Sequence, residues 1–382
     1  MSQRGVDQDM CPTPQDGGCQ DVPTGLHLPP GAFYNNNIGT CTADQVIESD
    51  QLDYDAGTFV WSGFDYLGEA RGWPQNTKCR GTLADVAGFD KESIHWFRSW
   101  WLSNISRSDA GRPLVNVDDE DDLWTLHIVE TWIEIPGKTT RTINVYTNCP
   151  RVTLQLNGKH LAGFVEDVSF FGMATFERVP YEAGNLTALG WDATGKNLVA
   201  SHSTFTPGEA AALSLSIDVP SVATGTGDAV LADGEDVAML RATLLDSNGH
   251  LVPSNGDHNI SFRIVSGDAR VIATHNGDPA NISPNHSPWV PTYGGLARAI
   301  VRVTIDASSP FRHRIAEIDA ESRRNVRVRV ESTIDPEDVA DIVVEATVAV
   351  GDRYITARVT VPVTTDLSKS PLGLATASGA GL

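Results

Sequence analysis

Short runs of alternating apolar and polar residues dominate the chain from about residue 111 to residue 365, and this feature most constrains its fold. Successive side chains of a strand point to opposite faces, so each run predicts a β-strand with one buried face. We expect strands at 124–128, 143–146, 152–156, 176–179, 186–191, 198–200, 213–219, 240–245, 260–265, 299–305, 326–330, 342–350 and 354–363.

Turn residues separate these runs. Asn157-Gly158 directly follows the run at 152–156 and predicts a type I′ hairpin turn, because both residues tolerate a positive φ. Asn248-Gly249 predicts a turn after 240–245. Several short strands with regular turns are typical of antiparallel β-sandwiches, and the runs fall into two groups on either side of residue 206. We therefore expect two β-sandwiches, the second of them Ig-like.

The first hundred residues have a different pattern. The stretch from Thr58 to Tyr66 is rich in aromatic and β-branched residues and is almost continuously apolar, which predicts a strand of a parallel sheet buried on both faces. A helix should follow, with Asp90 as its N-cap and with Phe97 and Trp101 on its apolar face. Together these segments predict one β/α unit.

A single β/α unit of this kind is incomplete. A parallel strand needs neighbours on both sides, and a whole barrel of such units takes about 250 residues. The 57 residues before Thr58 contain no comparable strand, so the unit is either a small cap on the sandwiches or the last piece of a barrel. Alone, it is expected to expose the aromatic faces of Phe59, Trp61, Phe64, Trp96, Trp100 and Trp101.

Charge and hydropathy argue against two classes of partner. Lys and Arg number 28 against 49 Asp and Glu, for a net charge of −21, and no basic stripe reverses this locally, so we expect no nucleic acid partner. No apolar stretch reaches the roughly 18 residues of a membrane helix, and the first thirty residues are polar, so neither a membrane partner nor a standard signal peptide is expected. Localisation and oligomeric state are left open.

Cysteine and histidine spacing offers no metal site. None of the five cysteines forms a Cys-x-x-Cys pair, which predicts free and mostly buried thiols, although a bridge such as Cys11 to Cys19 is the alternative in an oxidising compartment. Ten histidines lack a repeated spacing, and no phosphate-binding glycine loop occurs, so no cofactor or metal is expected. The cysteines are Cys11, Cys19, Cys41, Cys79 and Cys149.

Two further polar segments are predicted to be loops. The acidic run at 118–122 lacks the Gly and the terminal Glu of a regular calcium loop, so we interpret it as a solvated loop. Asn276-Gly277-Asp278-Pro279 is interpreted as a turn and not as a ligand site.

Several motifs resemble one enzyme family. The string at 59–69, the segment 85–91 and the Trp-rich helix resemble the end of the catalytic barrel of glycoside hydrolase family 2, especially its bacterial-type β-galactosidases. The segments 145–149, 152–159 and 179–186 are similar to the sandwich that follows that barrel, and 232–236 and 275–279 to the C-terminal Ig-like domain. These motifs occur in the family's order and cover nearly all of residues 34–305.

The resemblance implies a mainly β chain with two Ig-like (immunoglobulin-type) β-sandwiches, preceded by the terminal β/α unit of an incomplete TIM barrel. Residues 1–105 would be the remnant of the catalytic barrel, 106–206 the first β-sandwich, 207–366 the C-terminal Ig-like β-sandwich and 367–382 a disordered tail.

The resemblance also implies retaining hydrolysis of β-linked sugars, which needs two carboxyl groups about 5 to 5.5 Å apart. In the family both catalytic glutamates precede the strand that holds Trp61, and the chain resembles the family from just past the nucleophile, so neither is expected here. Asp65 and Glu69 are a poor substitute, because four residues of extended chain span roughly 13 Å. We expect this chain alone to be inactive.

Three residues are predicted to contact a sugar. Trp61 lies where the family places a tryptophan platform beneath the sugar, with a place in the barrel core as its alternative. Asp65 and Glu69 lie near the end of the predicted strand, where barrels gather their chemistry, and could bind sugar hydroxyls. Structural pairing with Arg71 or Lys78 is their alternative.

Three functional hypotheses remain. The first is the C-terminal part of a β-galactosidase-like family 2 glycosidase, with a carbohydrate such as a β-galactoside as partner. The second is an autonomous carbohydrate-binding or adhesion module made of the sandwiches, because sandwich domains host many functions. The third is a non-functional fragment that would aggregate through its exposed tryptophans.

Overall fold

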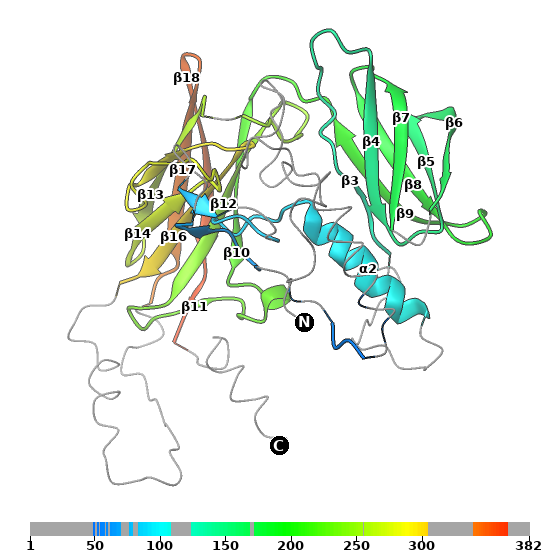
Figure 1. Ribbon diagram of the computed structural model, residues 1–382. Coiled ribbons are helices and arrows are strands. Elements are labelled where there is room, and N and C mark those ends of the chain that lie inside the picture. Colours follow the sequence, from blue (N-terminus) through cyan, green and yellow to red (C-terminus); the bar gives the residue numbers. More distant parts are fainter. Residues whose placement is uncertain are drawn as a thin grey trace. The chain divides into compact units, whose positions relative to one another are not determined.

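The chain is mainly β and divides into two compact units (Figure 1). The computed structural model describes residues 49, 52, 54–57, 59, 62–69, 76–78, 83–107, 124–168, 172–254, 256–304 and 339–365. The first unit comprises Met1–Gly208 and Gly277–Ile282, and the second comprises Glu209–Asn276 and Ser283–Leu382. The further divisions expected at residues 105 and 366 stay predictions.

The first unit contains a sandwich of two antiparallel sheets. One sheet has the order β3 (Leu126–Ile128), β4 (Thr140–Thr147), β7 (Met173–Pro180), and the other β6 (Lys159–Asp167), β5 (Arg151–Leu156), β8 (Asn185–Trp191), β9 (Leu198–Phe205). The alternating residues predicted to face inward do so. Ile143 on β4, Leu154 on β5 and Leu186 on β8 are fully buried in one core, which confirms the strand pattern of this region.

The hairpin between β5 and β6 has the predicted turn. Asn157 and Gly158 both have positive φ, 52° and 74°, and Leu156 pairs with Lys159 across them. The Asn157 side chain adds a long-range contact, because its Oδ1 accepts a hydrogen bond from the backbone N–H of Asn185 at 2.8 Å. Local turn chemistry therefore sets the register of this pair.

Helix α2 (Ser93–Arg107) packs against the first sandwich. Trp96, Phe97 and Trp100 form a cluster with Val129 and with Tyr146 of β4. Trp96 and Trp100, which the β/α unit was expected to expose if it stood alone, are each only 2% exposed because the sandwich covers them. The sheet that contains β4 buries one face in the sandwich core, and α2 contacts residues of its other face.

The N-cap prediction is also wrong. The helix begins at Ser93 and not directly after Asp90, which is exposed and forms an isolated bridge with Ala84. The N–H groups of Ile94 and His95 donate to the carbonyls of Lys91 and Glu92, so the chain enters the helix through a tighter turn.

In the stretch predicted as a strand from Thr58 to Tyr66, the described residues 59 and 62–65 are not part of a strand. Phe59 is exposed, and Phe64 makes only a single parallel bridge, to Ala84. Strand β1 (Tyr66–Leu67) pairs antiparallel with β2 (Thr77–Lys78). A parallel strand needs hydrogen-bonded neighbours along its length, and no other described segment pairs along this stretch.

The second unit is a sandwich of two four-stranded sheets with its own core. The orders are β10 (Ala212–Val219), β12 (Val237–Leu245), β16 (Leu296–Val303), β14 (Ala269–His275), and β15 (Trp289–Pro291), β13 (Asn259–Ser266), β17 (Ile342–Val350), β18 (Arg353–Val361). A short parallel pair joins β11 (Val230–Leu231) to β19 (Val363–Thr364). Leu240, Ile260 and Val344 are fully buried between the sheets.

The alternation rule predicted most of this unit. The runs at 213–219, 240–245, 260–265, 299–305, 342–350 and 354–363 coincide with β10, β12, β13, β16, β17 and β18 within a few residues. The run at 326–330 lies outside the described residues. Strands β11, β14 and β15 of this unit were not predicted, and neither was β6 of the first unit.

Candidate functional site

The three residues predicted to bind a sugar do not share one environment. Trp61 lies outside the described residues. Asp65 is buried and forms an ion pair with Lys91, whereas Arg71 and the side chain of Lys78, its expected alternative partners, lie outside the described part of the chain. Glu69 is exposed, has a positive φ of 51°, and accepts a 2.5 Å hydrogen bond from the hydroxyl of Tyr66. Their role in sugar binding stays a prediction.

Asp65 belongs to a buried carboxyl pair that organises the chain before α2. The second carboxyl, of Asp85, is 1% exposed, and its Oδ1 accepts hydrogen bonds from the N–H groups of Ala87 at 2.8 Å and Phe89 at 3.0 Å. Its Oδ2 is buried without a hydrogen bond. Burial raises the pKa of Asp85 from 3.8 to about 7. Both carboxyls therefore face packed protein and not solvent.

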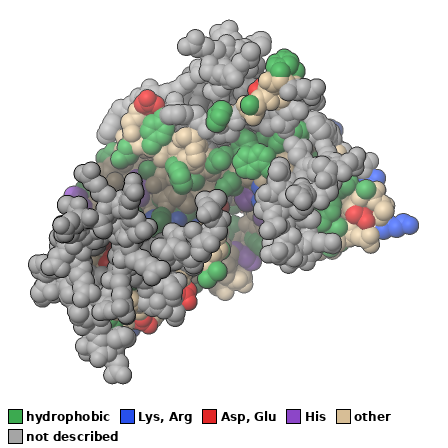
Figure 2. Space-filling view, turned by 90° about the horizontal axis from the view of Figure 1, so that it is seen from below, with side chains coloured by type: hydrophobic (Ala, Val, Ile, Leu, Met, Phe, Trp, Pro, Cys, Tyr) green, Lys and Arg blue, Asp and Glu red, His purple; other side chains and the backbone are tan. Residues whose placement is uncertain are grey.

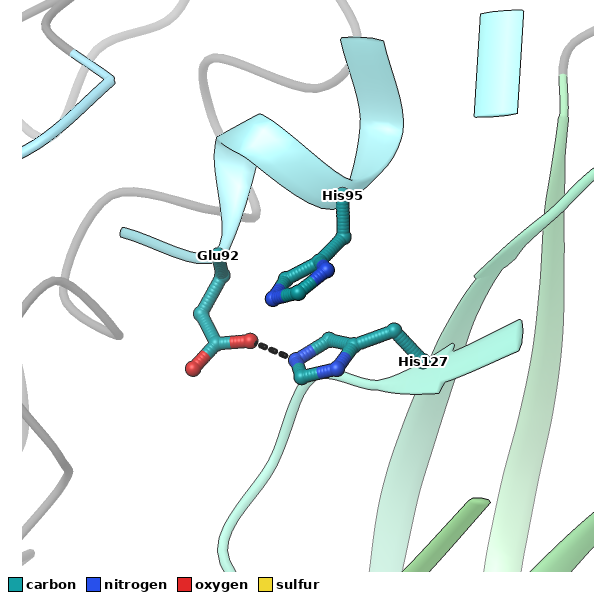
Figure 3. Close-up of side chains that lie close together, drawn as sticks. All are labelled: Glu92, His95 and His127. Carbon is teal, nitrogen blue, oxygen red and sulfur yellow. Dashed lines mark hydrogen bonds and ion pairs between the residues drawn. The ribbon is translucent and has the colours of Figure 1, made fainter. Parts of the chain in front are cut away.

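A second cluster of titratable groups lies between α2 and β3 (Figure 3). Glu92 directly precedes α2 and His95 lies in its first turn, so their spacing of three puts both on one face. His127 is the middle residue of β3. Because Leu126 and Ile128 point into the sandwich core, His127 points to the opposite face, where α2 lies.

The side chains of this cluster are in direct contact. The His95 and His127 rings stack with centroids 3.7 Å apart and planes 13° from parallel. The Nε2 of His127 meets the Oε2 of Glu92, and this contact is the dashed line in Figure 3. One ligand atom from each of the three residues lies within 4.8 Å of the others.

A third imidazole borders the cluster. The ring of His202, from β9, lies 4.5 Å from that of His127. Its Nδ1 accepts a hydrogen bond from the N–H of Ile128 at 3.1 Å. That bond places the proton of neutral His202 on Nε2, so neither of its ring nitrogens offers a free lone pair.

Burial keeps the cluster uncharged. It lowers the pKa of His95 and of His127 to about 4 and that of His202 to about 3, and it raises the pKa of Glu92 to about 8. Near neutral pH the contact between Glu92 and His127 is therefore a hydrogen bond from a carboxylic acid to a neutral imidazole.

The sequence did not predict this cluster. Glu92-x-x-His95 at the start of a helix was its one local signal, and a spacing of three is common in helices. His127 is distant along the chain, and only the packing of α2 on the sandwich brings it close. The acidic run at 118–122, considered for calcium, lies outside the described residues.

Cys149 is the described free cysteine, and it is buried. Burial raises the pKa of its thiol from 9.0 to about 11, which suppresses the reactive thiolate. The prediction of a free buried thiol is confirmed for this residue. Cys11, Cys19, Cys41 and Cys79 lie outside the described residues.

The described surface agrees with the acidic composition. On the face shown in Figure 2 the described Lys and Arg side chains are scattered and form no continuous basic patch. Among the described helices, none has the length and apolar character to span a membrane. The absence of nucleic acid and membrane partners stays a prediction.

Models of two protein families match the chain. Residues 223–310 match the model described as glycoside hydrolase family 2 C-terminal domain 5, and residues 138–199 match a domain of unknown function, DUF4982. The first match lies in the second sandwich and the other lies in the first.

Individual relatives point to the same family. The chain is similar to the β-galactosidase BoGH2A of Bacteroides ovatus (28% identity, over 60% of this chain and 23% of that protein) and to a β-glucuronidase of Formosa agariphila (30% identity, over 67% and 23%). It thus spans about a quarter of the length of these relatives.

Solved structures share the fold. A glycosyl hydrolase family 2 member from Bacteroides cellulosilyticus matches 85% of this chain and 36% of its own, with a TM-score of 0.56 at 20% identity. Family models, relatives and fold together show that the chain belongs to glycoside hydrolase family 2, where it corresponds to the C-terminal region.

Proposed function

We propose that the chain takes part in the hydrolysis of O-glycosyl bonds of β-linked sugars, as the C-terminal part of a β-galactosidase-type enzyme. The observation that carries this proposal is the order of the two sandwiches. Residues 138–199 and 223–310 match two family models in succession, and a β-galactosidase and a β-glucuronidase match 60% and 67% of the chain. Galactosides and glucuronides are accordingly the first substrates to test.

Within this function the buried carboxyls of Asp65, Asp85 and Glu92 serve as support and not as the catalytic carboxyl pair. Retaining hydrolysis needs one carboxyl that protonates the leaving oxygen and a second that attacks the sugar, both open to substrate. Asp65 is paired with Lys91, Asp85 accepts two backbone N–H bonds, and Glu92 contacts His127. Each of these carboxyls is buried, so none is available to a sugar.

A chimera tests the supporting role. The matching C-terminal segment of the Bacteroides ovatus β-galactosidase is replaced by residues 124–365 of this chain, and kcat/KM is measured on a chromogenic β-galactoside. We expect the chimera to keep kcat/KM within roughly tenfold of its parent, because a supporting domain acts on the barrel only by positioning it. A folded chimera with no activity would contradict the proposal.

Two measurements on the chain itself complete the test. The purified chain is expected to hydrolyse neither a chromogenic β-galactoside nor a β-glucuronide, with the intact Bacteroides enzyme as positive control. Turnover by the chain would show that it holds its own carboxyl pair. If the chimera is inactive and titration calorimetry of the chain with galactosides gives heat, the sandwiches are a binding module.

A further inference from the structure

The Glu92, His95 and His127 cluster has the composition of a metal site. Two imidazoles and one carboxylate are a donor set that binds Zn²⁺ with three protein ligands and leaves a fourth position for water. The three ligand atoms already lie within 4.8 Å of one another. In tetrahedral coordination with bonds of about 2.0 to 2.1 Å, such atoms lie roughly 3.3 Å apart.

We propose that Glu92, His95 and His127 bind one divalent transition metal, with Zn²⁺ as the best fit. The donors come from two elements, so a bound ion would join the start of α2 to the edge strand β3. The site is independent of glycoside hydrolysis.

Unused hydrogen-bonding capacity in the cluster supports this assignment. A satisfied core histidine has a partner for each ring nitrogen. Within the described residues, no hydrogen bond reaches either ring nitrogen of His95, which only stacks on His127. The Glu92 side chain is about nine-tenths buried, and its described hydrogen bonding is limited to His127 through Oε2. A metal would use the lone pairs that the protein leaves unused.

Little movement is needed to close the site. Glu92 and His127 are already in contact, so the main change is the approach of His95. The nitrogen lone pairs of the two stacked rings lie in parallel planes and do not converge on one point. Rotation of the His95 ring would turn one of its nitrogens toward the ion. His95 is half-buried and not sealed off, which leaves a path for the ion to enter.

A second acidic residue lies near the cluster. Burial is the main cause of the raised pKa of Glu130, and the nearby charge of Glu92 adds to it. His202 is excluded as a ligand because its Nδ1 is occupied by the N–H of Ile128.

Metal titration of the full chain tests the site. Metal is removed from the chain with EDTA in a reducing buffer, and the chain is then titrated with ZnCl₂ by calorimetry. Bound zinc is quantified by inductively coupled plasma mass spectrometry. We expect one Zn²⁺ per chain at micromolar concentration or tighter, and a rise in the Tm of the transition that contains the first unit. Co²⁺ in place of Zn²⁺ should give visible absorption bands that report nitrogen and oxygen ligands.

Variants separate this site from other metal binding. His95→Ala and His127→Ala should each weaken Zn²⁺ binding by roughly 100-fold or more and abolish the Co²⁺ bands. His160→Ala, which removes an exposed histidine of β6, should leave both unchanged. If His95→Ala lowers the Tm of the metal-free chain, His95→Gln replaces it as the test variant. The assignment is overturned if the parent binds no stoichiometric Zn²⁺, or if binding survives in both His95 and His127 variants.

Discussion

Asp85 makes the first unit sensitive to pH. Its pKa is raised from 3.8 to about 7 by burial, so the folded state binds this proton more tightly than the unfolded state does. The stability that the protonated carboxyl contributes is fully present below the unfolded pKa and is lost as the pH rises through about 7. Asp85→Asn removes the titration, while its Oδ1 can still accept from Ala87 and Phe89.

We therefore expect Asp85→Asn to be more stable than the parent at alkaline pH. The free energy of unfolding of the variant minus that of the parent should rise by roughly 2 to 3 kcal/mol between about pH 5 and pH 8. Urea unfolding at a series of pH values measures the difference. Asp192→Asn is the control, because hydrogen bonds within its own turn lower the pKa of Asp192 to about 2, below this window. Parallel pH profiles of parent and Asp85→Asn would contradict the expectation.

Single residues were predictable from the sequence where their chemistry is local. Asn157 and Gly158 form the expected turn because its φ angles are a property of those two residues. The partner of Asp65 was not predictable. Lys91 reaches it because the Asp65 and Lys91 backbone N–H groups donate to the carbonyls of Ala84 and Leu83, which is a tertiary arrangement. The metal cluster was missed for the same reason.

At the scale of elements, β8 has a glycine where its core-facing pattern calls for a side chain. Gly190 follows Leu186 and Ala188 on the buried face of the strand. A Cβ on Gly190 would lie 2.5 Å from the Sγ of Cys149 and 3.2 Å from its Cβ. The buried thiol thus occupies the space that a side chain at Gly190 would need.

Gly190→Ala should therefore destabilise the first unit by about 1 to 3 kcal/mol, as overpacking does. Cys149→Ala removes the sulfur, so the double variant should recover part of that loss, and a double-mutant cycle of unfolding free energies measures the coupling. Gly63→Ala is the matched control, because nothing lies within 4 Å of its Cβ position. Strictly additive effects of the two substitutions would refute the steric explanation.

Strands with a clear alternating period were predictable, and strands without one were not. In β8 and β12, buried residues alternate with more exposed ones, so the sequence pattern directly indicates the buried face. Strand β14 lies at the edge of its sheet, has a register shift between Val271 and Ala273, and buries only Thr274, so its sequence has no clear period. The apolar run at 58–66 has the composition of a strand, but strand formation also needs partners along its length.

At the scale of the whole molecule, composition and period predicted the mainly β class and the two sandwiches, because each sandwich buries a face that its own strands encode. The association of α2 with the first sandwich could not be predicted. Trp96 and Trp100 mark an apolar helix face, but the sequence does not say which surface covers it, and the structure gives Val129 and Tyr146. Trp96 and Trp100 are buried, but Trp101 is 53% exposed, so aggregation through exposed tryptophans stays a prediction.

The two units have separate cores, and this determines how the chain should melt. Leu154 is fully buried in the core of the first unit and Leu240 in that of the second. Truncation of a buried leucine costs about 2 to 5 kcal/mol through lost contacts and the cavity left behind. If each unit unfolds cooperatively around its own core, Leu154→Ala and Leu240→Ala should each lower the Tm of a different transition in differential scanning calorimetry.

Thr360→Ala is the control for these two variants, because Thr360 is exposed on β18 and should shift neither transition. If the chain shows a single transition and both leucine variants lower its Tm, the units unfold together. Such coupling requires the units to stabilise each other by an amount comparable to the stability of either core. If two transitions appear, the leucine variants assign each of them to a unit, and the assignment shows which unit has its Tm raised by Zn²⁺. Since Glu92, His95 and His127 all belong to the first unit, the ion should move the transition that Leu154→Ala lowers and leave the other in place.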